Sequence, residues 1–386
     1  MKKTFEKAQA LILIAIGMFA LLAITAVAVD GGNVLRDRRQ AQNAADTAAL
    51  AAALAITKNN PNWSQDALDR AASNGYLNDG TRSLVEVHRP PVNGPYAGNN
   101  EYVQVIITSH VPTYFANIVG FSQITNRVQA VARARPPQAL FNGNAVVGLA
   151  PTECKAVEFQ GNANMTINGN GIFVNSSCSC DQTAAFFNNS GSGTLVTPYI
   201  QSVGCVKYKE GAVQAGSIQW GSSVPPFSYP PAWLPPIPAC DYTWGNLSGS
   251  HTLQPGVHCV NGNFTINAND SLSGNGVTFV VYGEVRWNGG TVNLSAPTSG
   301  PTAGLLLYLP ITNNNPITFN GNASWNIRGT ILAPASDITV NGTEDGFSMR
   351  SQLIGYTVKL TGGGNTSITY NDSENIDQPP MIELSR

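Results

Sequence analysis

The sequence predicts an N-terminal transmembrane helix and a small α+β unit, followed by an all-β domain that we interpret as a parallel β-helix. A long uncharged run opens the chain, strand patterns follow a helical stretch, and short apolar strands with Asn-Gly turns recur from about residue 141. We divide the chain into an anchor and long helix (1–57), a small α+β stalk domain (58–137), a β-helix-like domain (138–376) and a C-terminal tail (377–386).

The composition excludes some classes of function. Of 386 residues, 11% are charged, against about 25% in an ordinary soluble domain. Residues 142–386 carry 8 Lys/Arg and 14 Asp/Glu, whereas residues 1–141 carry 13 and 9. A sparsely charged, slightly acidic C-terminal part offers no basic surface to a phosphate backbone, so we expect no nucleic-acid partner. Hydrophobic residues make up 42% of the chain, enough to form a core, so we do not expect disorder.

The N-terminal segment has the length and polarity of a membrane anchor. Three lysines precede an uncharged run at residues 8–29, which Asp30 closes, and about 20 apolar helical residues cross a hydrocarbon core. A cleavable signal peptide is the alternative, since Ala26-Val27-Ala28 has the form of a cleavage site, but the run is longer than signal peptides usually carry. We expect one span with the N-terminus in the cytoplasm, although three arginines on the far side weaken the positive-inside argument. These are Arg36, Arg38 and Arg39.

A second helical stretch follows the anchor. We expect Asp30-Gly31-Gly32 to interrupt the helix briefly, and residues 33–57 to continue as an Ala-rich helix. Alanines at i, i+3 and i+4 spacing form one stripe of this helix: Ala41, Ala45, Ala48, Ala52 and Ala55. Such a stripe lets another backbone approach closely. It serves either packing within its own domain or packing in a membrane-associated assembly.

This N-terminal stretch resembles a known family. The resemblance rests on Gln9-Ala10-Leu11, on Ala28-Val29-Asp30-Gly31-Gly32 and on residues 38–53, which contain Gln-Asn-Ala-Ala-Asp. In this order and spacing the motifs are similar to the N-terminal module of TadG-like proteins, in the Tad (tight adherence, Flp pilus) assembly family, over about residues 8–55. The resemblance implies a bacterial envelope protein with an N-terminal anchor, associated with pilus biogenesis or surface adhesion.

Two departures limit what the resemblance implies. The apolar run has no Gly at a prepilin-peptidase position before it and no early Glu, so the chain does not match a conventional processed pilin. Many TadG-like proteins also carry a von Willebrand A domain with an Asp-x-Ser-x-Ser metal motif. Residues 270–273, Asp-Ser-Leu-Ser, lack that spacing. Metal-dependent adhesion is therefore not implied, and we expect no metal site and no cofactor.

Residues 58–137 predict the small α+β unit. A helix is expected at 66–74 with Ser64 as its N-cap, strands at 83–88, 102–110 and 123–134, and a short helix at 113–119. A hairpin loop at 92–100 and a linker at 133–137 complete it. The order of elements resembles the pilin-like architecture of the Tad family. Two strand histidines, His88 and His110, have no second ligand at suitable spacing and are expected to be ordinary surface or hydrogen-bonded residues.

From residue 141 onward one pattern recurs, in which an Asn/Gly turn joins two apolar-x-apolar strands. Copies occur at 157–162, 165–171, 260–267, 277–282, 317–322, 338–342, 358–362 and 368–371. Short strands of this kind fit either a β-sandwich of hairpins or a parallel β-helix. We favour the β-helix, because Asn and Gly tolerate tight corners and stacked Asn side chains can hydrogen-bond from coil to coil. Residues 329–370 also resemble β-helical modules of bacterial surface and pilus-associated proteins.

A proline-rich segment, Trp220–Trp244, separates two groups of these repeats. Its seven prolines cannot donate to a sheet ladder, so we expect an extended excursion from the β-helix. Its aromatic side chains either cover a face of the β-helix or form a lip that binds a sugar or a protein partner. The residues considered for binding are Trp220, Phe227, Tyr229, Trp233 and Tyr242.

All the cysteines lie in the β-rich part, and their number is even: Cys154, Cys178, Cys180, Cys205, Cys240 and Cys259. This pattern indicates disulfides formed in an oxidising compartment, and hence a C-terminal domain outside the cytoplasm. The sequence does not fix the pairing, although we favour Cys240 with Cys259, which flank one excursion. A zinc site is disfavoured, because Cys178-Ser179-Cys180 is too tight for a zinc knuckle and His258 is isolated beside Cys259.

Enzymatic and calcium-binding roles have weaker support. Polysaccharide lyases and hydrolases on β-helices need paired carboxylates, or a carboxylate and a basic partner, on one face. The acidic residues here are scattered: Asp241, Asp270, Glu284, Asp337, Glu344 and Asp345. Glu284 and Arg286 point to the same face of one strand, as surface salt bridges often do. We therefore expect a protein that is not an enzyme. Oxygen ligands for calcium cluster at 267–274 and 341–345, but Asn/Asp-rich corners also arise for backbone reasons alone.

The sequence leaves two functional hypotheses. The first is a single-pass bacterial cell-membrane protein of the TadG-like type, which acts structurally in Tad/Flp pilus assembly or in surface adhesion. Its partners would be Tad pilus or other envelope proteins, and residues 8–29 would contact the membrane. The second is an anchored carbohydrate-binding or carbohydrate-active β-helix protein whose partner is a surface glycan.

Overall fold

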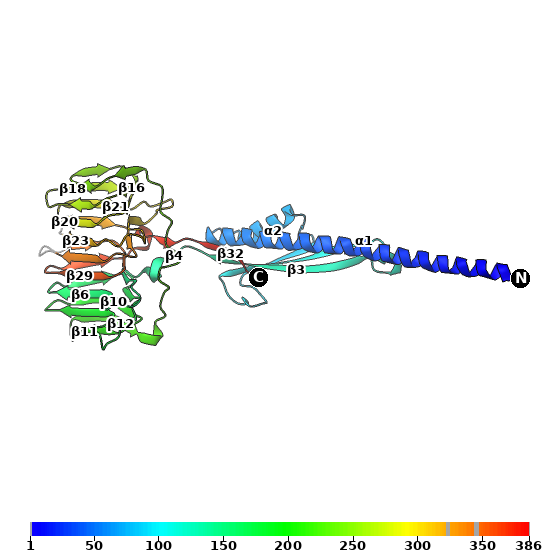
Figure 1. Cartoon of the computed structure of the whole chain (residues 1–386), viewed down its shortest axis with the longest axis horizontal. Helices are drawn as coiled ribbons and strands as arrows, with labels where there is room; N and C mark the ends of the chain where they lie inside the picture. The colour runs from blue at the N-terminus through cyan, green and yellow to red at the C-terminus, as the bar shows by residue number, and fades with distance from the viewer. Residues whose placement is uncertain (1, 322–324, 343–346, 386) are drawn as a thin grey trace. The chain divides into compact units, whose positions relative to one another are not determined.

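The computed structural model describes residues 2–321, 325–342 and 347–385. The chain forms two compact units. Unit 1 comprises Met1–Pro137 and Pro379–Arg386, and unit 2 comprises Gln138–Gln378. Figure 1 shows the elements of both units.

Unit 1 is a long helix packed on a small antiparallel sheet. The helix α1 (Lys2–Thr57) contacts α2 (Trp63–Ser73), β2 and β3. The sheet has the strand order β1 (Ser83–His88), β2 (Tyr102–Pro112), β3 (Gln123–Arg135) and β32 (Met381–Ser385). A single 3₁₀ turn, η1 (Ala116–Val119), lies between β2 and β3. The predicted strands of this unit are confirmed, with β2 and β3 slightly longer than expected.

The helix α1 is continuous through Gly31 and Gly32, so the predicted interruption is wrong. Each glycine costs about 1 kcal/mol relative to alanine inside a helix. Each glycine keeps its backbone N–H, however, so the i to i−4 hydrogen bonds of the helix continue through both positions. The two glycines add no side chain, and a Cβ at either position would meet no atom within 4 Å.

The helix α2 begins at Trp63, three residues before the predicted start, and Ser64 is not its N-cap. The N-cap is Asn62, whose side chain makes no capping hydrogen bond. Asn60 closes the turn instead: its Oδ1 accepts the Asn62 N–H at 3.0 Å, and its Nδ2 donates to Asp66 Oδ2 at 3.0 Å. The hydrogen bonds at the start of α2 therefore come from Asn60 and Asn62, before the position expected for the N-cap.

The predicted linker at 133–137 and tail at 377–386 are corrected at their ends. The strand β3 continues to Arg135 because β32 pairs beside it, from Val131 opposite Ser385 to Arg135 opposite Met381. Just before β32, β31 (Asp377–Gln378) pairs with β4 (Gln138–Ala139). The last described residues are therefore strands, and β32 completes the sheet of unit 1.

Unit 2 is a parallel β-helix with three strands per turn. The first strands stack in the order β13 (Tyr242–Trp244), β16 (Gly256–Val260), β19 (Val277–Val281), β22 (Leu305–Tyr308), β25 (Thr330–Ala333), β28 (Leu353–Gly355), β5 (Val146–Gly148), β8 (Ile172–Val174) and β10 (Leu195–Ser202). The second strands stack as β14 (Leu247–Ser248), β17 (Phe264–Ile266), β20 (Val285–Asn288), β23 (Ile317–Gly321), β26 (Ile338–Gly342), β29 (Val358–Gly362), β6 (Val157–Gly161), β9 (Phe186–Ser190) and β11 (Val206–Tyr208).

The third strands form two runs. One contains β15 (His251–Leu253), β18 (Ser271–Asn275), β21 (Thr291–Ser295) and β24 (Trp325–Arg328); the other contains β27 (Phe347–Met349), β30 (Thr366–Thr369) and β7 (Met165–Asn168), and reaches β12 (Val213–Trp220) through β10. Among the described residues, every strand pair of unit 2 is parallel except β4 with β31. The predicted β-helix is confirmed, and the alternative sandwich of antiparallel hairpins does not form.

The stacking order does not follow the sequence. The chain begins the β-helix at β5 in the middle of the stack and winds through β8 and β10 to one end. The proline-rich segment then leads to β13 at the opposite end, and the chain winds back until β28, β29 and β30 pair with β5, β6 and β7. We call this closing contact the seam. In Figure 1 it appears as orange strands beside cyan-green ones in the middle of the stack.

The interior of the β-helix is apolar and stacked from turn to turn. Trp287 is fully buried, with its ring centroid 5.2 Å from that of Phe264 and 4.9 Å from that of Phe319. At the strand ends, the predicted asparagine ladder is present. Asn341 Nδ2 donates to Asn320 Oδ1 at 2.7 Å, and Asn320 Nδ2 donates to Asn288 Oδ1 at 2.6 Å.

Candidate functional site

The described part of α1 contains one segment that is long and apolar enough to cross a membrane, within Ile16–Thr57, with a mean hydropathy of 1.8. A membrane span and a signal sequence share this character. The large apolar side chains before Asp30 are exposed: Ile14, Ile16, Met18, Phe19, Leu21, Ile24, Val27 and Val29. A helix with such a surface needs an apolar environment, which a bilayer provides.

The alanine stripe of α1 packs within unit 1. Ala41, Ala45, Ala48 and Ala52 are fully buried in a cluster that includes Val103 and other residues of β2 and β3. The short side chains let the helix lie close to the sheet. Of the two interpretations of the stripe, the structure supports packing on its own domain.

Asp30 joins the end of the apolar run to the loop between β2 and β3. Its carboxylate accepts the backbone N–H groups of Tyr114, Phe115 and Ala116 at 2.9, 3.0 and 2.8 Å. The hydrogen bond from Ala116, followed by that from Tyr114, holds the pKa of Asp30 below its usual range. The carboxylate is therefore ionised at neutral pH and fixes this loop on the helix.

Asp37, two helical turns further on, makes a second polar contact between α1 and the rest of unit 1. Its Oδ2 accepts from Ser109 Oγ at 2.5 Å and from Asn126 Nδ2 at 2.8 Å, and its Oδ1 accepts from Tyr76 Oη at 3.0 Å. Burial, and then the Asp37 carboxylate, raise the pKa of Tyr76. This role of Asp37 was not predicted from the sequence. The seven-residue spacing from Asp30, which puts both on one helix face, is a signal that could have found it.

The proline-rich segment covers the outer face of the β-helix sheet that contains β22 and β25. We call residues 221–241 the strap. The Phe227 ring lies edge-on to Phe141 and Phe173, each at 5.0 Å between centroids, and Trp233 lies 5.0 Å from Phe141. Asn175 also fixes the strap, because its Oδ1 accepts the Phe227 N–H at 2.7 Å and its Nδ2 donates to the Phe227 carbonyl at 3.1 Å.

Two tyrosines add hydrogen bonds between the strap and this face. Tyr229 Oη donates to the Pro334 carbonyl at 3.3 Å, and Tyr308 Oη donates to the Pro235 carbonyl at 3.2 Å. Proline carbonyls still accept hydrogen bonds although the proline nitrogen cannot donate. The strap therefore packs on the apolar side chains on the outer face of this sheet and shields them from solvent.

Trp220 and Tyr242 flank the strap and are more exposed than Tyr229 or Trp233. Trp220 is 51% exposed at the end of β12, and Tyr242 is 39% exposed at the start of β13. Tyr242 stacks on His258 with 4.6 Å between ring centroids. The five aromatic residues selected from the sequence thus divide into three that contact the sheet and two at opposite ends of the strap.

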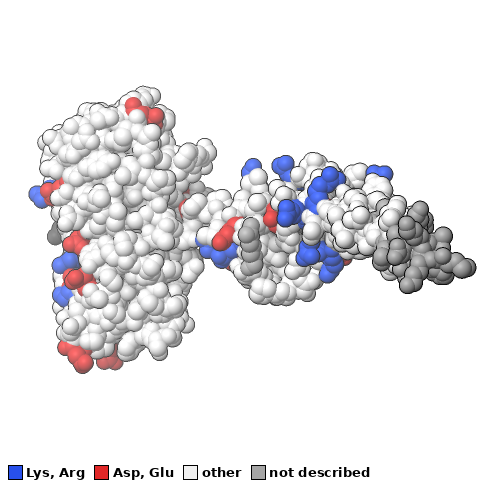
Figure 2. All heavy atoms as spheres, turned by 45° about the vertical axis from the view of Figure 1, so that its right-hand side comes forward, with Lys and Arg blue, Asp and Glu red and all other residues white. Residues whose placement is uncertain are grey.

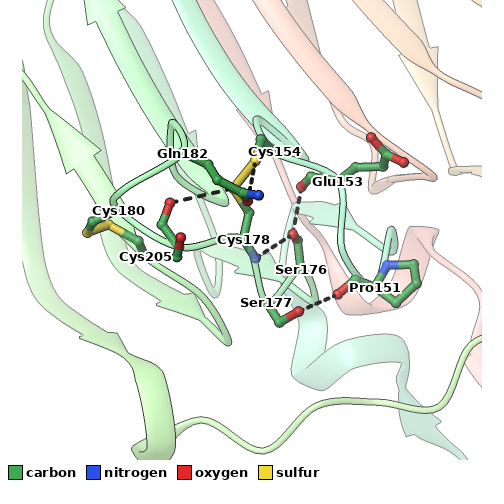
Figure 3. The surroundings of a disulfide bond; sticks show 10 residues. Pro151, Glu153, Cys154, Ser176, Ser177, Cys178, Cys180, Gln182 and Cys205 are labelled. Atoms are coloured by element: carbon green, nitrogen blue, oxygen red, sulfur yellow. Dashed lines mark hydrogen bonds between the residues drawn. A yellow bond between two sulfur atoms is a disulfide. The ribbon is translucent and has the colours of Figure 1, made fainter.

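All six cysteines form disulfides: Cys154–Cys178, Cys180–Cys205 and Cys240–Cys259. The favoured Cys240–Cys259 pair is confirmed. Figure 3 shows the turn around Cys178, whose N–H donates to Ser176 Oγ at 3.1 Å while that hydroxyl donates to the Glu153 carbonyl at 2.6 Å. Each bridge joins neighbouring turns of the β-helix, or a turn to the strap.

The titratable residues singled out in the sequence lie apart. Asp241 accepts the Val257 N–H at 2.8 Å, Asp337 accepts Thr357 Oγ1 at 2.5 Å, and Asp270 accepts the Asn267 N–H at 2.7 Å. Glu284 and Arg286 form an ion pair at 2.5 Å. His110 Nδ1 lies 3.1 Å from Thr125 Oγ1, and His88 lies 3.9 Å from Glu86.

Within the described residues, no three His, Cys, Asp or Glu side chains gather as a metal site would require. Glu344 and Asp345, part of one calcium hypothesis, lie outside the described residues. At the other calcium candidate, residues 267–274, the Asp270 carboxylate is engaged in its own turn.

The fold and these contacts define a class of protein, with an apolar N-terminal helix, a small α+β unit and a disulfide-bonded parallel β-helix. Within this class, residues 8–55 match the Tad family model, described as Flp pilus-assembly TadE/G-like. The chain therefore carries a TadE/G-like domain there, as the sequence motifs indicated. No curated protein matches the chain.

Proposed function

We propose that this protein is a structural component of Tad/Flp pilus assembly or of surface adhesion, anchored in the bacterial cell membrane by α1. The observation that carries the proposal is that one chain contains both a TadE/G-like domain, at residues 8–55, and a disulfide-bonded β-helix. The TadE/G-like domain indicates an association with the Tad pilus-assembly system, and the β-helix provides a large, rigid surface for contact with partners. In this proposal the β-helix contacts protein partners and carries out no chemistry.

The proposed orientation places the N-terminus in the cytoplasm and unit 2 outside it. Three disulfides support this orientation, since such bonds persist in oxidising compartments and are rare in the cytoplasm. Figure 2 shows that the visible surface of unit 2 is mostly uncharged. A large uncharged surface suits contact with other envelope proteins better than contact with nucleic acid.

Protease treatment of intact cells tests the location. Antibodies against unit 2 would follow its cleavage, and membranes would be probed for an anchored N-terminal fragment. Cleavage on intact cells supports surface display and adhesion, whereas cleavage only after the outer envelope is opened supports a role in assembly. Protection of unit 2 even then would place it in the cytoplasm and overturn the proposal.

A gene-replacement experiment tests the link to the Tad system. Cells that lack the protein should lose Flp pili or surface attachment, and the full chain should restore them. A chain carrying Asp69→Asn, at an exposed position on α2, is a matched control and should restore them as the wild type does. Normal piliation and attachment without the protein would contradict the proposal.

Glycan binding is the second proposal, because Trp220 and Tyr242 expose aromatic surface beside the strap. It predicts that Tyr242→Ala or Trp220→Ala weakens retention of the full chain on immobilised cell-surface polysaccharide. Phe187→Ala, a half-buried ring on β9 away from the strap, is the control. Equal retention of all three variants and the wild type would remove this proposal.

A further inference from the structure

The loop between β2 and β3 carries exposed apolar side chains. In residues 113–122, which we call the β2–β3 loop, Tyr114, Ile118 and Phe121 are 67, 80 and 66% exposed. Three large apolar side chains this exposed on one short loop form a patch that needs an explanation. Pilus assembly and adhesion, as proposed above, leave the loop without a role.

The loop is closed by its own hydrogen bonds. The Thr113 N–H donates to the Ser122 carbonyl at 3.2 Å, and the Thr113 hydroxyl donates to the Phe121 carbonyl. The Phe121 N–H returns to the Ala116 carbonyl at 3.0 Å. The apolar side chains therefore project from a fixed framework and do not fold back onto unit 1.

Asp30 sets the position of the loop along α1. Its three hydrogen bonds go to Tyr114, Phe115 and Ala116, at the start of the loop. The uncharged run of residues 8–29 ends one residue earlier. As a helix this run is about 33 Å long, which matches a hydrocarbon core of about 30 Å. When the run spans a bilayer, Asp30 lies at its boundary with water, and the loop lies at the same depth.

We propose that the β2–β3 loop inserts into the interfacial layer of the bilayer that α1 crosses. Ile118 and Phe121 would enter the acyl-chain boundary, and Tyr114 would lie at headgroup level, where tyrosine is favoured. This inference rests on the proposed membrane anchoring. Lipid is the occupant because Asp30 holds the loop at the end of the exposed apolar run of α1, where Val27 and Val29 are 75 and 41% exposed.

The charged side chains near the loop are also consistent with contact with lipid. Arg36, Arg38, Arg39 and Arg127 are exposed on the part of unit 1 that follows Asp30. Figure 2 shows several Lys and Arg side chains on the visible face of unit 1. Such cations attract anionic headgroups at the surface, whereas the loop requires apolar contact below it. The two contributions can be separated by lipid composition.

Site-directed quenching of the full chain in vesicles tests the inference. All six native cysteines are in disulfides, so Ile118→Cys introduces a single thiol that can be labelled with bimane. In vesicles of phosphatidylcholine, lipids with a nitroxide near the headgroup should quench this label strongly, and aqueous iodide should quench it weakly. Val92→Cys, 59% exposed in the loop between β1 and β2 at the other end of the sheet, is the matched control. It should show the opposite pattern.

A third label separates this inference from the anchoring that it requires. Val27→Cys lies in the apolar run and should be quenched by lipid in every case where α1 spans the bilayer. Lipid quenching at 27 but iodide quenching at 118 would overturn the loop insertion and leave anchoring intact. Iodide quenching at both positions would overturn anchoring as well.

Two further experiments test what holds the loop at the membrane. In the Ile118→Cys background, Asp30→Ala should shift quenching at 118 toward iodide and leave the Val27→Cys label unchanged. Lipid quenching at 118 that appears only with phosphatidylglycerol would assign the contact to the arginines and overturn apolar insertion. Protection of the 118 label from both quenchers would indicate that a second copy of the chain covers the loop, and it would likewise overturn the inference.

Discussion

Single carboxylates determine how α1 meets the rest of unit 1. Asp30 holds the β2–β3 loop, and Asp37 joins Tyr76, Ser109 and Asn126. From the sequence, Asp30 marked only the end of an apolar run. Its partners are 84 to 86 positions away in the chain, so no local pattern reveals them. The helix and the strands were predictable, and the spacing of Asp30 and Asp37 marks one helix face, but the partners of the two carboxylates were not predictable.

Asp79 provides a pH-dependent prediction at this scale. Its carboxylate accepts the N–H groups of Thr81, Arg82 and Ser83, and these bonds, that of Thr81 foremost, lower its pKa from 3.8 to about 2. A depressed folded-state pKa contributes stability that is present above pH 3.8 and is lost as the pH falls toward about 2. Asp79→Asn should therefore be less stable than the wild type at neutral pH and should lose that deficit in acid.

Denaturant unfolding of both proteins across this pH range measures the effect. The difference in unfolding free energy should shrink as the pH falls through the stated window. Asp69→Asn, at an exposed position on α2, is the matched control. A difference for Asp79→Asn that stays constant with pH would contradict the assignment.

At the scale of elements, the strap shows what a sequence can and cannot specify. Seven prolines correctly predicted an extended excursion. Whether its aromatics face a partner or the β-helix depends on the opposite surface, formed by Phe141, Phe173 and Tyr308. Those residues come from other turns, so the sequence left both possibilities open.

The strap yields a stability prediction. Trp233→Ala should lower the unfolding free energy of unit 2 by about 2 kcal/mol or more, because it removes an aromatic ring packed on Phe141. Trp220→Ala, at a position 51% exposed, should change it by about 0.5 kcal/mol or less. Thermal and denaturant unfolding of the two variants compares them directly. Equal losses would mean that the strap does not contribute as a cover.

The disulfides give a second prediction for elements. Cys240 and Cys259 close a segment of 19 residues, and removal of such a crosslink typically costs about 3 kcal/mol. The Cys240→Ala/Cys259→Ala double variant should lose about that much stability while the other two bridges remain. Peptide mapping without reductant should find the three pairs described here. A peptide that joins Cys178 to Cys205 would contradict the pairing.

Local patterns identified several strands of the β-helix, because a short apolar strand beside an Asn/Gly turn carries its own signal. The copies at 157–162, 338–342 and 358–362 coincide with β6, β26 and β29 within a residue. Errors occurred where helical neighbours override the preference of a residue, as at Gly31-Gly32, and where a nearby residue takes the expected role, as at Ser64. The anchor helix tolerates two glycines because its neighbours on both sides are strongly helical.

At the scale of the whole molecule, the seam could not be predicted from the sequence. Gln352 donates to the carbonyl of Asn144, 208 positions earlier in the chain. A repeat pattern indicates that turns stack on their neighbours, but equivalent repeats do not indicate which turn is the neighbour. The fold class was therefore predictable, whereas the order of the turns was not.

The return of β32 to unit 1 leads to a prediction for the full chain. A chain that ends at Pro380 would leave the β3 edge unpaired and remove five residue pairs from Val131 to Arg135. Unit 1 should lose roughly 1–5 kcal/mol, from cross-strand pairs of about 0.2–1 kcal/mol each. Scanning calorimetry should show the unit 1 transition at a lower temperature and the unit 2 transition unchanged. An unchanged unit 1 transition would show that β32 adds no stability.

The seam also constrains how the protein can be made. During synthesis the chain emerges from its N-terminal side, and β5, β6 and β7 appear long before their partners β28, β29 and β30. Until then one side of that turn has open backbone edges, which are sites of aggregation. Contacts between segments so distant also slow folding. The β-helix can therefore close only after β28, β29 and β30 have been synthesised, near the end of the chain's production.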